Sequence, residues 1–149
     1  MRCLALLGIA ERMPVHVDLQ AAADAHDRLA PELMVAWGHG RVGHFGGHPA
    51  PGLWMLGNAL TLIERSLEGV LAADLAACNA YGGALATAAR VLCPTLFILG
   101  AADRMTPPAR SRPLREAIAS ARMTVLPDTG HMLMTERPDA VIDALKDVV

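Results

Sequence analysis

The chain has 149 residues, which is enough for one folded domain, and 53% of them are hydrophobic but only 3% aromatic. This much aliphatic material can bury a core, which excludes a disordered chain. The formal net charge is -2, Lys146 is the single lysine, and neither sign of charge forms a long run. A nucleic-acid groove needs clustered basic residues, so that class of function is excluded as well.

The cysteines and the apolar runs indicate a reduced, cytoplasmic protein. Cys3, Cys78 and Cys93 are odd in number and far apart, so they form no disulfide framework, zinc ribbon or Cys-x-x-Cys motif. No stretch reaches the roughly 18 to 20 uncharged apolar residues of a membrane span. In residues 1–10 the apolar run is brief, only one positive charge precedes it, and no signal-peptide cleavage site follows, so we expect a buried strand there.

Three short apolar runs are predicted to be strands, at residues 3–7, 95–99 and 123–126. The first two are continuously apolar, which is typical of strands buried on both faces of a parallel sheet. Each run is followed by a residue that ends strands, namely Gly8, Gly100 and Pro127.

Between the first two strands the patterns are helical. Helices are predicted over residues 18–30, 31–37, 53–66 and 75–90, and residues 38–52, rich in Gly, Pro and His, are predicted to form a loop. A helical insertion over residues 18–90 therefore interrupts a strand-helix-strand arrangement.

Two more helices are predicted after the second strand. Thr106 is expected to cap the first, which begins at Pro107, and Pro113 is expected to kink or break it near residues 109–113. Its apolar face is formed by Leu114, Ala117, Ile118 and Ala121. The last helix has Pro138 in its first turn, and its apolar face is formed by Val141, Ile142, Leu145, Val148 and Val149. Residues 91–149 thus form one right-handed strand-helix-strand unit with a closing helix, in the α/β class.

Two loops place chemically active side chains at the ends of predicted strands. Asp103 lies in CPTLFILGAADRMTPP (residues 93–108), and His131 lies in LPDTGHMLMTERPDAV (residues 126–141). A lone Asp in a turn is usually a turn former or a helix cap. Catalytic groups of parallel sheets, however, collect at the carboxyl ends of strands, where both residues are expected. The Asp103 carboxylate would then accept from the imidazole and hold its tautomer, with His131 as general base and later general acid.

These two loops resemble those of the α/β-hydrolase family. The segment from Gly100 to Pro107 fits the acid motif, a strand ending in Gly, two residues, Asp, two residues and Thr-Pro, and Gly130-His131 with Glu136-x-Pro138 fits the histidine motif. Residues 1–10 resemble the sixth strand of that fold, LLGIAERMPVH the passage to a cap, and residues 18–90 the helical cap. The resemblance implies the C-terminal part of one hydrolase domain, with about three parallel strands, flanking helices and a cap insertion.

The chain departs from the family at the nucleophile. The G-x-S-x-G turn that follows the fifth strand of the family has no counterpart, and the three serines (Ser66, Ser111 and Ser120) lie in helical patterns without flanking glycines. The oxyanion hole is lost with that turn. The resemblance implies hydrolysis of a small ester or related substrate by a nucleophile-His-Asp mechanism without a cofactor, in which this chain alone is inactive. The alternative is a non-catalytic fragment or pseudoenzyme that acts as an assembly partner.

A sheet of three strands would leave residues 3–7 as an apolar edge that invites pairing. We therefore expect a homodimer or a partner chain through that strand, as for a truncated reading frame, a decayed gene product or half of a split enzyme.

Two further groups of residues are candidate binding sites. His39, His44 and His48 share one Gly-rich loop, but no Cys, Asp or Glu accompanies them in it, so a solvated loop is favoured over a metal site. Met132, Trp37 and Trp54 are candidates to line an apolar substrate pocket, and ordinary core positions account for them equally well.

Overall fold

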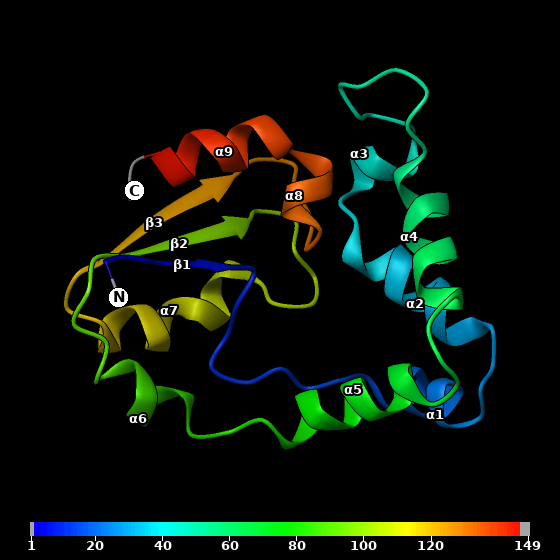
Figure 1. Ribbon diagram of the computed structural model, residues 1–149, viewed down its shortest axis with the longest axis horizontal. Helices are drawn as coiled ribbons and strands as arrows, with labels where there is room; N and C mark the ends of the chain where they lie inside the picture. The colour runs from blue at the N-terminus through cyan, green and yellow to red at the C-terminus, as the bar shows by residue number, and fades with distance from the viewer. Residues whose placement is uncertain (1, 147–149) are drawn as a thin grey trace.

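A three-stranded parallel sheet organises the protein, for which a computed structural model describes residues 2–146. The strands are β1 (Leu4–Leu7), β2 (Thr95–Gly100) and β3 (Ala121–Leu126), in the order β1-β2-β3 (Figure 1). Both strand pairs are parallel, with Leu4 opposite Thr95 and Thr95 opposite Ala121. The predicted α/β class and the three parallel strands are confirmed.

The strands differ in burial. Every residue of β2 is buried, as predicted, whereas every residue of β1 is only partly buried. Side chains of β1 do pack against the clusters on both faces, Leu6 on one and Leu7 on the other. The strand is less buried than predicted because, within residues 2–146, it lies at the edge of the sheet and pairs on one side only.

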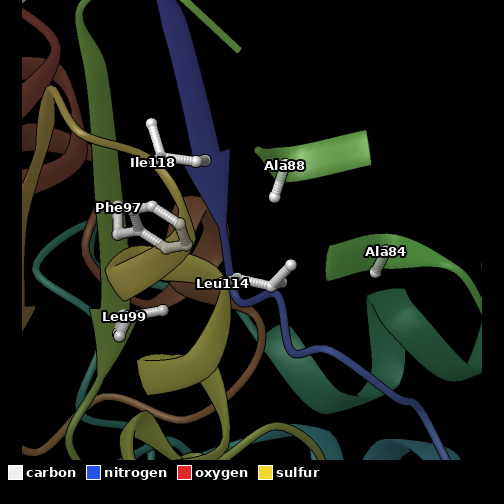
Figure 2. Packing of buried hydrophobic residues seen from close by; sticks show 6 residues of the cluster. All are labelled: Ala84, Ala88, Phe97, Leu99, Leu114 and Ile118. Atoms are coloured by element: carbon white, nitrogen blue, oxygen red, sulfur yellow. The ribbon is translucent and has the colours of Figure 1, made fainter. Parts of the chain in front are cut away.

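Helices cover both faces of the sheet, and side chains that alternate along β2 contact them. Phe97 and Leu99 point to the side of α6 (Ala84–Ala88) and α7 (Pro108–Ala117), where they pack with Leu114 and Ile118 (Figure 2). The other face is covered by α8 (Leu133–Glu136) and α9 (Pro138–Lys146). Its buried residues are Leu96, Ile98, Leu126, Leu133, Val141 and Ala144.

Residues 17–80, here called the helical segment, lie beyond the carboxyl ends of the strands (Figure 1). The segment contains α1 (Val17–Asp24), α2 (Leu29–Gly38), α3 (Arg41–His44), α4 (Met55–Glu64) and α5 (Val70–Ala80). It has a buried cluster of its own, formed by Leu19, Ala22, Ala23, Ala30 and Leu75. In the described part of the chain, no helix is long and apolar enough to cross a membrane.

Several helix bounds differ from the predictions because turns interrupt the apolar patterns. The helix predicted at 18–30 ends at Asp24, since His26 has a φ of 54° and turns the chain before α2. The helix predicted at 75–90 is two helices, because Gly83 (φ 75°) separates α5 from α6. The loop predicted at 38–52 contains α3.

The two C-terminal helices also differ in part from the predictions. α7 begins at Pro108 with Pro107 as its N-cap, so Thr106 is not the cap, and the helix continues through Pro113 without the expected break. A proline removes only one intrahelical bond, and the buried Ser111 and Leu114 hold the helix on either side of it. Ile118 and Ala121 belong to the core but lie beyond the end of α7.

The last helix begins at Pro138, as predicted. It buries Val141 and Ala144, three positions apart on one face, whereas the expectation for Ile142 was wrong, because its side chain is 53% exposed. Val148 and Val149 lie outside the described residues.

Candidate active site

The acid loop follows β2 and holds Asp103 in a tight turn. Asp103 is only 4% exposed, and its Oδ1 accepts hydrogen bonds from the backbone N–H groups of Met105 (2.8 Å) and Thr106 (2.9 Å). These two bonds orient the carboxylate and leave Oδ2 free to accept from side chains.

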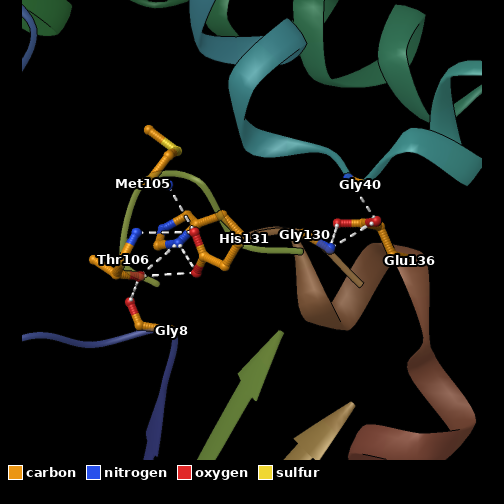
Figure 3. A network of polar contacts seen from close by, with 8 residues as sticks. Gly8, Gly40, Met105, Thr106, Gly130, His131 and Glu136 are labelled. Atoms are coloured by element: carbon orange, nitrogen blue, oxygen red, sulfur yellow. Dashed lines mark hydrogen bonds and ion pairs between the residues drawn. The ribbon is translucent and has the colours of Figure 1, made fainter. Parts of the chain in front are cut away.

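The histidine loop follows β3 and brings His131 to that second oxygen. His131 Nδ1 lies 2.9 Å from Asp103 Oδ2 (Figure 3). The loops pack so closely that a Cβ on Gly100 would lie 2.2 Å from the carbonyl oxygen of Gly130. Gly8 lies close to the imidazole itself, since a Cβ on Gly8 would lie 3.2 Å from both Cε1 and Nδ1 of His131. Glycine at these positions lets the backbone approach the site closely.

Thr106 is a further residue of the site, which we had predicted only as a helix cap. Its hydroxyl lies 2.6 Å from the Gly8 carbonyl oxygen, 2.8 Å from Asp103 Oδ2 and 3.1 Å from His131 Nδ1 (Figure 3). The hydroxyl has a single proton, which it can donate to only one of the two oxygens at a time. Thr106 therefore joins the end of β1 to both loops, and its place in the Asp-x-x-Thr-Pro motif was the signal for this role.

The hydrogen bonds of Asp103 decide its protonation. Burial alone would raise the pKa of this carboxyl group, but the bonds from the His131 side chain and the Thr106 backbone outweigh burial and lower the pKa below its ordinary value. Asp103 is thus an anion near neutral pH. With a proton on Nδ1, the imidazole keeps Nε2 as its basic nitrogen. Among the described residues, no hydroxyl or thiol lies within hydrogen-bonding distance of Nε2.

Glu136 is a second buried carboxylate beside the site. It is 4% exposed, and its oxygens accept the backbone N–H of Gly40 (2.9 Å) and of Gly130 (3.0 and 3.1 Å) (Figure 3). Because Gly130 precedes His131, Glu136 connects the histidine loop to the helical segment.

The candidate pocket residues lie in different places. Met132 lies near Met105, since the side chains of both approach Gly38. Trp37 packs edge-on against His16 at the helical cluster. Trp54 is 69% exposed and borders a hollow of about 220 Å³ with Val35, His44 and Leu60. Neither Asp103 nor His131 lines that hollow.

The remaining candidates make local contacts. Ser111 donates to the Pro108 carbonyl oxygen and Ser120 to that of Cys93. The three histidines weighed as metal ligands also make local contacts. Ring nitrogens of His39 and His44 lie 2.9 and 3.1 Å from carbonyl oxygens of α2, and His48 accepts from the Ala50 N–H. Across residues 2–146, His, Cys, Asp and Glu side chains do not form a group of three or more able to hold a metal ion.

The solved structures most like this chain include hydrolytic enzymes. A thermophilic esterase from Thermogutta terrifontis (malate bound) is 24% identical, with a TM-score of 0.76 over 97% of this chain and 54% of its own. The enol-lactonase from Burkholderia xenovorans LB400 is 25% identical, with a TM-score of 0.79 over 98% of this chain and 56% of its own. An N-acyl homoserine lactone degrading enzyme is 19% identical, with a TM-score of 0.79 over 99% of this chain and 57% of its own.

The chain therefore spans slightly more than half the length of these solved structures. A search of curated proteins gave no match. The model of the "Alpha/beta hydrolase family" matches residues 4–144, which is nearly the whole chain. This chain belongs to the alpha/beta hydrolase family.

Proposed function

We propose that this chain supplies the acid and the base of a nucleophile-His-Asp hydrolase that acts on a small ester or related substrate. The observation that carries the proposal is the 2.9 Å contact between Asp103 Oδ2 and His131 Nδ1. It lies at the carboxyl ends of β2 and β3, where parallel sheets assemble their sites. The similar structures include an esterase and an enol-lactonase, which supports an ester as the substrate class.

In the proposed mechanism, His131 Nε2 removes the proton of a nucleophilic hydroxyl as that oxygen attacks the ester carbonyl. The Asp103 carboxylate stabilises the imidazolium that forms. His131 then returns the proton to the departing alcohol, and the acyl group is released by water in a second round of the same steps. This chemistry needs no cofactor. Met132, beside His131, is the candidate of this chain for contact with the substrate.

The nucleophile in this proposal comes from a strand-turn-helix segment that pairs with the free edge of β1. That edge ends at Gly8, whose backbone already contacts the His131 ring and Thr106. A strand added beside β1 would therefore end close to the His131 ring, whose Nε2 has no hydroxyl partner among the described residues.

The free edge of β1 also supports the alternative, an assembly partner without catalysis. An unpaired apolar strand edge favours pairing with a second copy or another chain. Sedimentation of the purified chain tests this pairing. We expect a dimer that dissociates in an Ala5→Pro variant, because proline removes an N–H group from the free edge, whereas the side chain of Leu6 packs against the core. A monodisperse wild-type monomer would count against it.

The test of the hydrolase proposal is a chimera. The part of the Thermogutta terrifontis esterase that this chain does not cover would be fused ahead of Leu4. We expect hydrolysis of p-nitrophenyl acetate that falls about 10⁴-fold in the Asp103→Asn variant, as when a triad acid is removed. His131→Ala should lose the activity at least as completely.

His44→Ala is the matched control, because His44 is exposed, its ring nitrogen lies 3.1 Å from the Ala36 carbonyl oxygen, and the hollow that it borders includes neither Asp103 nor His131. A folded chimera that hydrolyses the ester equally well with and without His131 would refute the proposal. A fluorophosphonate adduct on the 149-residue chain itself, lost in His131→Ala, would place the nucleophile within this chain instead.

A further inference from the structure

We propose that Glu136 is a positioning residue, which fixes the backbone that carries His131 by binding it to the helical segment. This inference rests on the proposed function and deepens it, because it assigns the orientation of the general base, His131, to the side chain of Glu136, five residues further along the chain. It rests on a single junction, formed by residues 38–40 on one side and residues 130–136 on the other.

The first observation is a buried charge that backbone groups alone compensate. Within residues 2–146, no Lys, Arg or His lies at ion-pair distance from Glu136, although its side chain is almost fully buried. A buried carboxylate is costly unless hydrogen bonds replace its water. The N–H groups of Gly40 and Gly130 provide these bonds, and they come from the two sides of the junction.

The second observation is that the junction is reciprocal. The carbonyl oxygen of Gly38 accepts the N–H of His131 at 2.8 Å and the N–H of Met132 at 3.1 Å. The helical segment thus donates a hydrogen bond to the core through the N–H of Gly40 and accepts hydrogen bonds from it through the carbonyl oxygen of Gly38. The backbone of His131 is itself one of the groups held, so a shift of residues 38–40 would shift the base.

The third observation is that the two backbones touch. A Cβ on Gly130 would lie 2.3 Å from the Gly40 nitrogen and 2.6 Å from the carbonyl carbon of His39. A Cβ on Gly40 would lie 2.9 Å from both the Gly130 nitrogen and Glu136 Oε2. Gly40 has an ordinary φ of -66°, so glycine serves there to allow the approach and not an unusual conformation.

Removing the carboxylate would leave two N–H donors facing the space that it filled. Buried donors without acceptors are strongly disfavoured, so the junction would open to admit water. Residues 38–40 would then no longer hold residues 130–132, and the His131 ring would lose its fixed orientation toward Asp103. Asp103, Thr106 and His131 would all still be present.

The experiment is NMR on the 149-residue chain, which needs no catalysis. In Glu136→Ala we expect amide hydrogen exchange of Gly40 and Gly130 to accelerate about ten- to a hundredfold, as for a lost bond to a charged acceptor. The His131 Nδ1 proton should broaden. Glu136→Gln should restore part of the protection, because its carbonyl oxygen still accepts while its NH₂ group faces an N–H. Glu116→Gln, on the exposed side of α7, is the matched control and should change none of these signals.

Gly40→Ala tests the junction from the opposite side and keeps Glu136. The added methyl group should separate the backbones and broaden the same His131 proton, although the change lies in the helical segment. If Glu136→Ala does not fold, Glu136→Gln and Gly40→Ala decide the question. Folded variants, with β2 amides as protected as in the wild type, whose Gly130 and His131 signals are unchanged would overturn the proposal.

The outcomes for this inference and for the hydrolase function are separable. The NMR variants can respond as expected while the chimera shows no His131-dependent hydrolysis. Glu136 would then still hold the His131 backbone, but this contact would have no role in catalysis. An active chimera with an unresponsive junction would remove only the role of Glu136.

Discussion

The core and the helical segment bury different kinds of side chain. In the core, Phe97, Ile98 and Leu99 of β2 are completely buried between helices on both faces of the sheet. In the helical segment, three of the five buried residues of the cluster are alanines. Large apolar side chains of the same segment, including Phe45, Trp54 and Leu62, are exposed. Because burial stabilises in proportion to apolar area, the core has the larger hydrophobic contribution per residue.

The difference separates the part of the chain that holds the candidate site from the part that adjoins it. Asp103 and His131 lie on loops at the carboxyl ends of β2 and β3, which pair with each other, so the core sets the distance between them. The helical segment contacts the histidine loop through the junction at Gly38 and Gly40. We infer that the segment opens at lower free energy than the core, as weakly packed units of proteins do.

The largest effect is expected from truncation in the core. Phe97→Ala should lower the free energy of unfolding by about 3–5 kcal/mol, because it removes a fully buried ring and leaves a cavity against Leu114. Urea unfolding followed by circular dichroism measures this loss. A change below about 1 kcal/mol would mean that the two faces of the sheet are not packed as described.

The counterpart in the helical segment is Leu19→Ala. It should cost about 2–5 kcal/mol locally, since Leu19 is the buried residue around which the alanines pack. Hydrogen exchange should accelerate in α1, α2 and α5 and remain unchanged in β2 if the segment opens on its own. Equal acceleration in β2 would show that the core and the helical segment unfold as one unit.

Two glycines, Gly100 and Gly82, differ in how closely other backbone approaches them. Gly100→Ala should cost about 3 kcal/mol, because its Cβ would meet the carbonyl oxygens of Gly130 and Thr129 at 2.2 and 2.4 Å. Gly82→Ala, between α5 and α6, would meet no atom within 4 Å and should change stability by no more than about 0.5 kcal/mol. Thermal unfolding of both variants measures the difference, and similar midpoints would argue against the close packing of the two site loops.

The same contrast explains what could be predicted from the sequence. The β2 run and the two loop motifs were predictable because their geometry depends on few residues: a continuously apolar strand, the glycines of close approach, and an acid and a histidine at strand ends. The site residues missed were Thr106, interpreted as a cap, and Glu136, noted only within a motif. Both act through contacts between distant segments, with Gly8 and Gly40, which local patterns do not reveal.

In the helical segment, by contrast, the bounds of the helices depended on single turns. A left-handed His26 and a left-handed Gly83 ended helices that the apolar periodicity would have continued. Alanine is favourable throughout such stretches and marks neither a face nor an end. The prediction that Ile142 is buried was wrong for a related reason. Periodicity alone could not decide which of the adjacent residues Val141 and Ile142 faces the sheet.

The smallest effect tests the site itself, through the pH dependence of Asp103. Asp103→Asn should lower the free energy of unfolding by about 1.5–3 kcal/mol near neutral pH, because an amide must turn its NH₂ group toward N–H donors that the carboxylate accepts. The folded-state pKa of Asp103 lies below its ordinary value, so its contribution is complete above that ordinary value and is lost as the pH falls through the folded-state pKa.

The difference in unfolding free energy between wild type and variant should therefore shrink as the pH falls from the ordinary aspartate pKa through the lower folded-state pKa of Asp103. Asp139→Asn, in the first turn of α9, is a control for general effects of carboxylate titration. A difference that stays constant over this range would mean that Asp103 is not held as an anion by His131 and Thr106. In that case the core would set the distance between Asp103 and His131 without keeping Asp103 ionised. The core and the helical segment would then differ only in how well their side chains are packed.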